Sequence, residues 1–265
     1  MIRVCLAQLE VTDSKKENLA RVISSIEKVG KQAELIIFPE YCMGVPREGL
    51  SREYLNDLAE PLNGEFLSAV ADASKRTQVA AVVPVYEKDE SSVCNTAVVI
   101  DRGKVLGGYR KIHLFDALGY RESDMFRAGS SPMLFKVRDM TLGLVICYDV
   151  RFPELFRIEA MSGAHAIVAP SGWYAGPLKE EQWQALLMAR AQENTIYVIG
   201  VGNANKAFIG RSAVMDPLGV KVLDLGAGDR VGFYELDESR IIKAREMLPL
   251  LNQAGGTNYG RCVQL

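Results

Sequence analysis

The chain has few of the residues from which many sites are built. Its 265 residues include only two histidines, His113 and His165, too few for a histidine-rich metal site. The five cysteines are an odd number, widely spaced and without a Cys-x-x-Cys pair. Neither a disulfide framework nor a zinc knuckle is therefore expected. Unpaired thiols of this kind are typical of the reducing cytosol.

Long apolar runs and blocks of like charge are also missing. The longest apolar run is about 79–86 and contains Pro84, whereas a membrane helix needs about 20 apolar residues. The 31 basic and 33 acidic side chains are interspersed and leave a net charge of −2, so nothing favours nucleic acid or an anionic membrane as a partner. The N-terminus has no apolar signal segment. We therefore expect a cytoplasmic protein.

What the chain does contain is an alternation of strand and helix patterns. Strands are predicted at 2–9, 34–38, 79–86, 93–101, 104–110, 133–137, 141–147, 165–170, 196–202, 210–216, 219–224 and 230–236. Helices are predicted at 14–31, 65–77, 153–163, 179–194 and 237–246. Turn residues predict hairpins at 101–104 and 216–219. No linker or repeat divides the chain, so we expect a single layered α/β domain over 1–265, with a tail from about 248.

Three predicted strands each end in a chemically useful side chain. Pro39 stops the second strand and leaves Glu40 at its end, and Lys111 follows the strand 104–110. Cys147 ends the strand 141–147 and opens a polar turn before a helix. Because ligands bind beyond the carboxyl ends of strands in open α/β sheets, we expect the three side chains to meet in one cleft.

The chemistry of these three side chains is coherent. A thiol at a strand–helix junction lies near the positive end of the helix dipole, which favours the thiolate of Cys147. A carboxylate such as Glu40 can take the thiol proton, and an ammonium such as Lys111 can stabilise an oxyanion. With histidine scarce, this set is the one that the chain can supply for acyl transfer.

Three blocks of sequence around these residues resemble a known family. Phe38-Pro-Glu40, Tyr109-Arg-Lys111 and Cys147-Tyr-Asp-Val-Arg-Phe-Pro-Glu154 are similar to the three catalytic blocks of the nitrilase (carbon–nitrogen hydrolase) superfamily, in its amidase-like branch. The blocks occur in the family's order. The similarity continues through 189–194 and 210–219 and so covers nearly the whole chain.

The resemblance implies a four-layer α-β-β-α sandwich, usually assembled as a homodimer. It implies that Glu40 is the general base and acid, that Lys111 stabilises the intermediate and that Cys147 is the nucleophile. The backbone N–H of Tyr148 would join Lys111 in the oxyanion hole. Glu122 matches a second glutamate found in many members, which would orient the site or assist proton transfer. The reaction it implies uses an acyl-enzyme and neither a metal nor an organic cofactor.

Several of these residues also fit ordinary structural roles. Cys147 on its own could be a small buried residue, and Glu122 could be an acid on a surface loop. Trp173 and Tyr174 follow the strand 165–170 and either form a wall of the substrate pocket or pack against the helix at 179–194.

Other residues near the three blocks are predicted to have supporting roles. We expect Asp149, Arg151 and Glu154 to form a network under the nucleophile turn, and His113 to be a structural hydrogen-bonding residue. Cys42, two residues after Glu40, is the rival thiol and is expected to pack or to line the pocket. Cys5 is predicted to lie in the core, and Cys94 and Cys262 offer no chemistry.

The leading functional hypothesis is hydrolysis of a small carboxamide to an acid and ammonia. The alternatives are an N-carbamoyl hydrolase, whose substrate carboxylate Arg151 or Lys179 could recognise, a true nitrilase, and a non-catalytic scaffold. The tail departs from many amidase-like members because 249–253 has no Arg pair and Tyr259 follows a Gly-rich segment. This departure concerns dimer contacts more than the chemistry.

Overall fold

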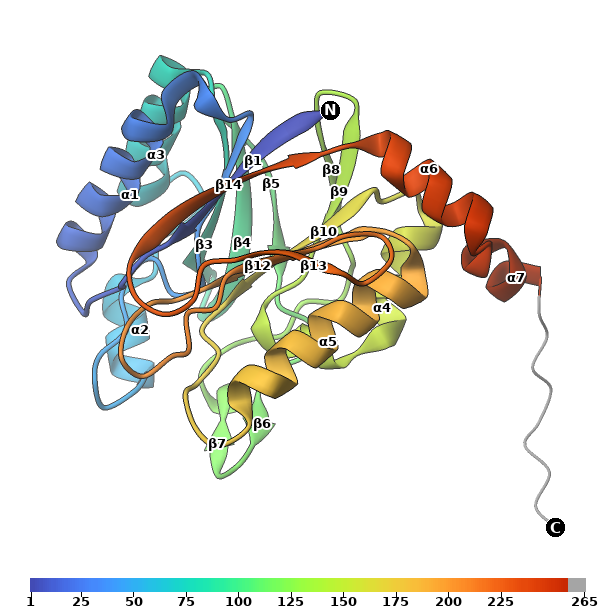
Figure 1. Cartoon of the computed structure of the whole chain (residues 1–265). Helices are drawn as coiled ribbons and strands as arrows, with labels where there is room; N and C mark the ends of the chain where they lie inside the picture. Colours follow the sequence, from blue (N-terminus) through green and yellow to red (C-terminus); the bar gives the residue numbers. More distant parts are fainter. Residues whose placement is uncertain (257–265) are drawn as a thin grey trace, which may run out of the picture.

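Two six-stranded β-sheets lie face to face, with helices covering their outer faces (Figure 1). The computed structural model describes residues 1–256. The first sheet has the order β14 (Arg230–Leu236), β1 (Ile2–Gln8), β2 (Leu35–Ile37), β3 (Ala80–Asp89), β4 (Ser92–Asp101) and β5 (Lys104–Arg110). The second has the order β13 (Lys221–Asp224), β12 (Ala213–Met215), β11 (Tyr197–Gly202), β10 (Ala166–Ser171), β9 (Met140–Leu144) and β8 (Leu134–Val137).

The helices form the two outer layers. The helices α1 (Lys15–Val29) and α3 (Glu65–Thr77) lie over the first sheet, with α2 (Arg52–Leu58) at one end (Figure 1). The helices α4 (Pro153–Met161) and α5 (Lys179–Asn194) lie over the second, followed by α6 (Glu238–Met247) and α7 (Leu250–Gly256). The predicted four-layer α-β-β-α sandwich is therefore confirmed.

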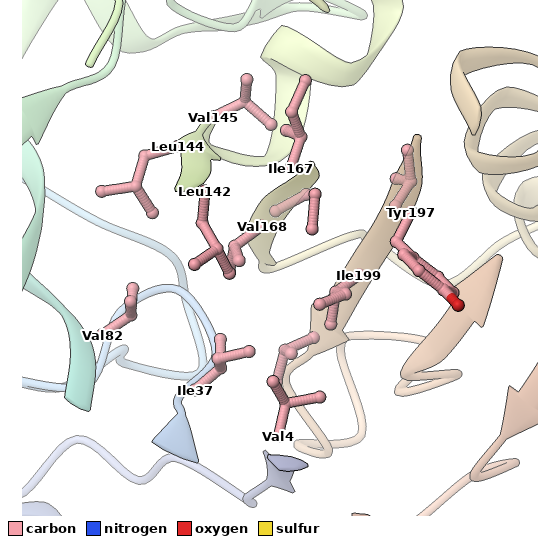
Figure 2. Packing of buried hydrophobic residues seen from close by; sticks show 14 of the residues in the cluster. Val4, Ile37, Val82, Leu142, Leu144, Val145, Ile167, Val168, Tyr197 and Ile199 are labelled. Atoms are coloured by element: carbon pink, nitrogen blue, oxygen red, sulfur yellow. The ribbon is translucent and has the colours of Figure 1, made fainter. Parts of the chain in front are cut away.

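Side-chain alternation along the strands explains the layering. In β1, Val4 and Leu6 point between the sheets, whereas Cys5 and Ala7 belong to the cluster under α1 and α3. Figure 2 shows Val4, Ile37 and Val82 of the first sheet facing residues of the second, such as Val168. Because both faces of these strands are covered, nearly all of their residues are apolar and the sequence does not alternate between apolar and polar side chains.

Most predicted elements are present within a few residues of their expected ends. Both predicted hairpins are confirmed, and Arg102 and Gly103 take the two positive φ values (48° and 86°) of the tight turn between β4 and β5. The helices α2 and α7 and the hairpin of β6 (Asp116–Ala117) and β7 (Tyr120–Arg121) were not predicted. The helix α2 was missed because it has only seven residues, of which only Leu55 is buried, and so it shows no apolar periodicity.

One strand ends earlier than predicted. The strand β9 stops at Leu144, three residues before Cys147, and Cys147 instead opens the short 3-10 helix η3 (Cys147–Arg151). The expectation that the strand continues to Cys147 was therefore wrong. The apolar run continues to Ile146 because these residues remain buried after the ladder has ended.

The end of the chain is described only in part. The helix α7 contacts α4 and α5, so the apolar start of the tail packs on the second helical layer. Residues 257–265, with Tyr259 and Cys262, lie outside the described residues. Among residues 1–256, no helix is both long enough and apolar enough to cross a bilayer.

A buried acid on α4 stands out because the fold gives it no ion pair. Glu159 is 1% exposed and neither carboxyl oxygen has a hydrogen-bond partner of normal geometry among the described residues. Its carboxyl lies over Gly143 of β9, where any Cβ would collide with it. Burial raises the pKa of Glu159 well above its usual value, although the backbone N–H groups of Met133 and Leu144 act against the shift.

Glu159 should therefore make the protein less stable as the pH rises. Above the ordinary carboxyl pKa of 4.5, Glu159 keeps its proton in the folded state but has lost it in the unfolded chain. The free energy of unfolding therefore falls as the pH rises, by at most about 1.4 kcal/mol per pH unit from this group. Glu159→Gln should raise the melting temperature at pH 8 and change it much less at pH 5.

The matched control is Glu154→Gln, because Glu154 is exposed on the same helix. This variant should melt like the unmodified chain at both pH values. An equal effect of Glu159→Gln at pH 5 and pH 8 would contradict a neutral buried acid.

Candidate active site

The three residues expected to meet lie together at one end of the sandwich. Glu40 lies in the turn after β2, Lys111 directly follows β5, and Cys147 begins η3 after β9. The ammonium of Lys111 lies 3.1 Å from Oε1 of Glu40. Lys111 and Cys147 line the same pocket, and the charges of Glu40 and Lys111 both act on the thiol. The structure thus brings together residues 40, 111 and 147 from both sheets.

Donors from both sheets hold the Glu40 carboxylate in place. Nδ2 of Asn95, on β4 in the first sheet, donates to Oε1 at 2.8 Å. The backbone N–H of Gly172, after β10 in the second sheet, donates to Oε2 at 2.7 Å. Glu40 is fully buried, so these bonds and that of Lys111 replace its lost hydration. A carboxylate with both oxygens bound has one orientation, as a positioned base requires.

Lys111 is a buried cation between two acids. It is 1% exposed and pairs with Oε2 of Glu122 at 2.8 Å as well as with Glu40. Burial opposes its charge, but the carboxylates of Glu122 and Glu40 outweigh that effect and raise the pKa of Lys111 well above its usual value. Lys111 therefore stays an ammonium, which is the form that can donate to an oxyanion.

Glu122 lies in the site and not on a surface loop. It opens the 3-10 helix η2 (Glu122–Asp124) directly after the β6–β7 hairpin, which returns the chain to Phe115. The N–H of Phe115 donates to Oε2 of Glu122 at 2.7 Å. Burial and the charge of Glu40 raise the pKa of Glu122, while Lys111 acts in the opposite direction.

Asp149 holds the turn that carries Cys147. Its Oδ2 accepts from the hydroxyl of Tyr109 at 2.8 Å and from the N–H of Ile146 at 2.9 Å. Its Oδ1 accepts from the N–H of His113 at 2.9 Å and lies 2.8 Å from Nδ1 of the same residue. His113 therefore has the structural hydrogen-bonding role predicted for it.

The turn itself is strained at the nucleophile. Cys147 has φ +47°, a left-handed conformation that costs a residue with a Cβ about 1–2 kcal/mol. The bonds to Asp149 keep it there. Tyr148 is the second residue of η3, in the first turn, where a helix leaves N–H groups without intrahelical partners. An N–H at this place can donate to an oxyanion formed next to Sγ.

Cys147 is held as a thiol, contrary to the sequence-based expectation of a favoured thiolate. Burial and the charge of Glu40 raise the pKa of Cys147 above its usual value, and Lys111 and the Ser171 hydroxyl only partly offset this. Lys111 is weakened as an activator because its charge is already shared by two carboxylates. A thiol in this state becomes a nucleophile only when a base removes its proton.

The network predicted under the turn is only partly present. Asp149 is fully buried and belongs to it. Arg151 does not lie under the turn but lines the pocket, and Glu154 is exposed on α4. The prediction for Arg151 and Glu154 was therefore wrong. The polar stretch after Cys147 winds into η3, which points its side chains in different directions within one turn.

The pocket beside Cys147 is a small recess with mostly aromatic walls. It measures about 370 Å³, counting the part open to solvent. Its walls are formed by Tyr41, Lys111, Phe115, Cys147, Tyr148, Arg151, Gly172, Trp173, Tyr174 and Lys179. A recess of this size and lining suits a small molecule.

Trp173 fulfils both roles considered for it. It lines the pocket and its ring lies 5.1 Å from that of Trp183 on α5. Its indole N–H donates to the carbonyl of Lys179 at 3.0 Å, which fixes the ring. The guanidinium of Arg151 lies 4.7 Å from the ring centre of Trp173 and donates to the side chain of Gln182. Arg151 is thus held on the pocket wall without an acid.

The other described cysteines are buried away from this chemistry. Cys5, Cys42 and Cys94 are free and buried, and Cys5 lies in the core as predicted. Sγ of Cys42 lies 3.1 Å from the carbonyl oxygen of Pro39, and burial raises the pKa of this thiol. Cys42 therefore packs and does not line the pocket. Within residues 1–256, no cluster of three or more His, Cys, Asp or Glu side chains is arranged to hold a metal ion.

Sequence reasoning missed the residues that orient the site. Asn95 is a polar residue inside a buried strand, a signal that could have been noticed. Tyr109 was quoted only as part of a motif. The N–H of Gly172 left no signal, because a backbone donor does not depend on the residue type.

Comparison with known proteins agrees with this geometry. Residues 3–246 match the family model described as carbon-nitrogen hydrolase. The chain is 32% identical to the deaminated glutathione amidase of Escherichia coli O157:H7, covering 94% of this chain and 95% of that protein. It is 31% identical to the omega-amidase NIT2 of Mus musculus, and the match covers 97% of this chain and 96% of that protein.

Solved structures agree with the fold. The crystal structure of Saccharomyces cerevisiae Nit3, a member of the nitrilase superfamily, has a TM-score of 0.82 at 27% identity and covers 98% of this chain and 97% of that one. A CN-hydrolase superfamily protein of Xanthomonas campestris has a TM-score of 0.85 at 22% identity, with coverage of 98% and 99%. From its motifs, its fold and these relatives, the chain belongs to the carbon–nitrogen hydrolase family and is a hydrolase of the amidase-like branch.

Proposed function

We propose that this enzyme hydrolyses a small carboxamide to the carboxylic acid and ammonia through an acyl-enzyme on Cys147. The observation that carries the proposal is the arrangement of Glu40, Lys111 and Glu122 around a thiol that opens onto a small pocket. Such a site offers a base, an oxyanion donor and a nucleophile without any histidine.

The first half of the reaction forms a thioester. Glu40 takes the proton of the Cys147 thiol as Sγ attacks the amide carbon, because the raised thiol pKa leaves little thiolate beforehand. The carbonyl oxygen becomes an oxyanion, which accepts hydrogen bonds from the ammonium of Lys111 and the N–H of Tyr148. The C–N bond then breaks, its electron pair leaves with nitrogen, and Glu40 returns the proton so that ammonia departs.

The second half consumes one water. Glu40 removes a proton from the water as its oxygen attacks the thioester carbon, and the same donors stabilise the second oxyanion. Collapse breaks the C–S bond, and the thiolate of Cys147 recovers the proton from Glu40. The balance is one amide and one water to one acid and one ammonia. Glu122 keeps Lys111 charged and in place throughout.

The pocket favours an amide that carries a carboxylate away from the scissile bond. Arg151 and Lys179 lie on its wall, and neither forms an ion pair within the described part of the chain. A guanidinium held by Trp173 and Gln182 is already oriented to bind a carboxylate. The names of two relatives, an omega-amidase and a deaminated glutathione amidase, agree with this substrate class.

We also propose that the protein is a cytoplasmic homodimer. Three apolar side chains are largely exposed on the outer faces of α4 and α5: Ile158 at 51%, Met161 at 54% and Met188 at 41%. A second copy would remove them from water. The free thiols of Cys5, Cys42 and Cys94 support a reducing compartment.

Ammonia release should depend on Cys147. Wild type, Cys147→Ala and Glu40→Gln should be assayed on omega-amides, amides resembling deaminated glutathione, N-carbamoyl amino acids and nitriles. We expect release from an amide, a loss of at least about 10³-fold in kcat for both variants and a thioester adduct by mass spectrometry. Cys42→Ala is the matched control, because that thiol lies outside the pocket.

Three results of this assay would contradict the proposal. Activity that survives Cys147→Ala would exclude the acyl-enzyme. Release only from carbamoyl compounds, with carbon dioxide, or only from nitriles would assign one of the other hydrolase reactions. Inactivity on all compounds, with slow iodoacetamide labelling of Cys147, would favour the scaffold.

Replacing Arg151 should affect only substrates with a carboxylate. Arg151→Gln should lower kcat/KM for a four-carbon omega-amide acid about 10–100-fold, the worth of a hydrogen bond to a charged group, and leave butyramide nearly unchanged. Lys179→Gln should act in the same direction, and Arg76→Gln, on the far helical layer, should change neither. An equal loss on both substrates would show that Arg151 supports the site and does not select the substrate.

A charge on the exposed apolar face should dissociate the dimer. Light scattering should give twice the chain mass of 29.2 kDa for wild type and a single chain mass for the double variant Ile158→Lys, Met188→Lys. The control is Lys16→Glu at the start of α1. A wild-type monomer, or a double variant that stays dimeric, would place the proposed interface elsewhere.

A further inference from the structure

The hydroxyl of Ser171 is a buried donor next to the site. Ser171 ends β10 and is fully buried, and its Oγ forms no hydrogen bond of normal geometry in the described part of the chain. Its backbone is engaged, because its carbonyl accepts from the N–H of Asn203 at 2.9 Å. The next N–H, that of Gly172, holds Glu40. A buried hydroxyl without a partner is costly, so its position calls for a role.

The neighbour of this hydroxyl is the nucleophile. The residues of β10 contact η3, which begins at Cys147, and Ser171 acts on the Cys147 side chain as a hydrogen-bonding group. The O–H of a serine rotates freely, so it can turn toward Sγ when negative charge forms there. Catalytic hydrogen bonds are often long in the free enzyme and shorten as charge develops.

The thiolate of Cys147 needs such a donor because the charges around it are unfavourable. The buried cluster holds two carboxylates, Glu40 and Glu122, against the single ammonium of Lys111. A negative sulfur next to this cluster is therefore repelled more than it is attracted. A neutral donor stabilises the thiolate without adding a charge that would disturb the Lys111 pairs.

We propose that the hydroxyl of Ser171 is a catalytic group that donates a hydrogen bond to Sγ of Cys147, both as the thiol loses its proton and as the thioester releases the thiolate. This inference rests on the proposed role of Cys147 as nucleophile. In the first step the bond forms as the S–H proton passes to Glu40. In the last step the same bond stabilises the leaving thiolate until Glu40 returns the proton.

The test is the pH dependence of Cys147 alkylation. The second-order rate constant for iodoacetamide should be measured at Cys147 by mass spectrometry between pH 6 and 10. Ser171→Ala should react about tenfold more slowly at pH 8, with the profile shifted to higher pH, and kcat/KM for the amide should fall by a similar factor. Ser171→Cys, with a weaker donor of similar size, should give a smaller shift if Ser171→Ala does not fold.

Ser212→Ala is the matched control. Ser212 is fully buried directly before β12, and its hydroxyl accepts from the N–H of Gly202 at 2.9 Å, so its loss can lower stability without touching the thiol. Its alkylation profile should equal that of wild type. Melting temperatures of all variants identify those that stay folded.

The outcomes separate this inference from the proposed function. Folded Ser171→Ala or Ser171→Cys with the wild-type profile would overturn the Ser171 assignment alone. The same shift of the alkylation profile in Ser212→Ala would show that the effect of Ser171→Ala comes from altered packing. Wild-type protein whose Cys147 is inert, or activity that survives Cys147→Ala, would instead overturn the nucleophile itself.

Discussion

The buried ammonium of Lys111 is the constraint around which the site is organised. A cation that is 1% exposed is stable only if its partners compensate for its lost hydration. Glu40 and Glu122 do so at 3.1 and 2.8 Å, and in turn each needs its own donors. Removing Lys111 would leave two buried carboxylates without a counter-ion. These ion pairs therefore fix the three side chains at this end of the sandwich, and in the proposed reaction the same ammonium is the oxyanion donor.

The donors that complete this cluster connect the two sheets. Glu40 follows β2 of the first sheet yet accepts from Gly172 of the second. Asp149 follows β9 of the second sheet yet accepts from Tyr109 of the first. The apolar interior packs the sheets without direction, whereas these two carboxylates fix how the sheet ends face one another.

The nucleophile differs from an activated thiolate at a helix end. Cys147 lies in a strained turn, surrounded by more negative than positive charge, and its proton is retained at rest. In the proposed reaction such a thiol attacks only as Glu40 takes its proton, and the substrate is selected at the pocket wall. There Arg151 is held on Trp173 and forms no ion pair within residues 1–256.

The sequence by itself determined the architecture and the three side chains that meet in the candidate site. Apolar runs with period two or 3.6 depend on local composition, and the motifs around Glu40, Lys111 and Cys147 are contiguous, so both can be read from the chain. Only the tertiary structure decided the rest. Asn95 and Gly172, which bind Glu40, lie 55 and 132 residues from it in the chain. The short helix α2 has no apolar periodicity that a sequence pattern could show. Arg151 lines the pocket because of the way η3 winds after Cys147. The pKa of Cys147 was misjudged for the same reason. It depends on the sum of burial and charges that distant segments bring to one place, and no local pattern carries that sum.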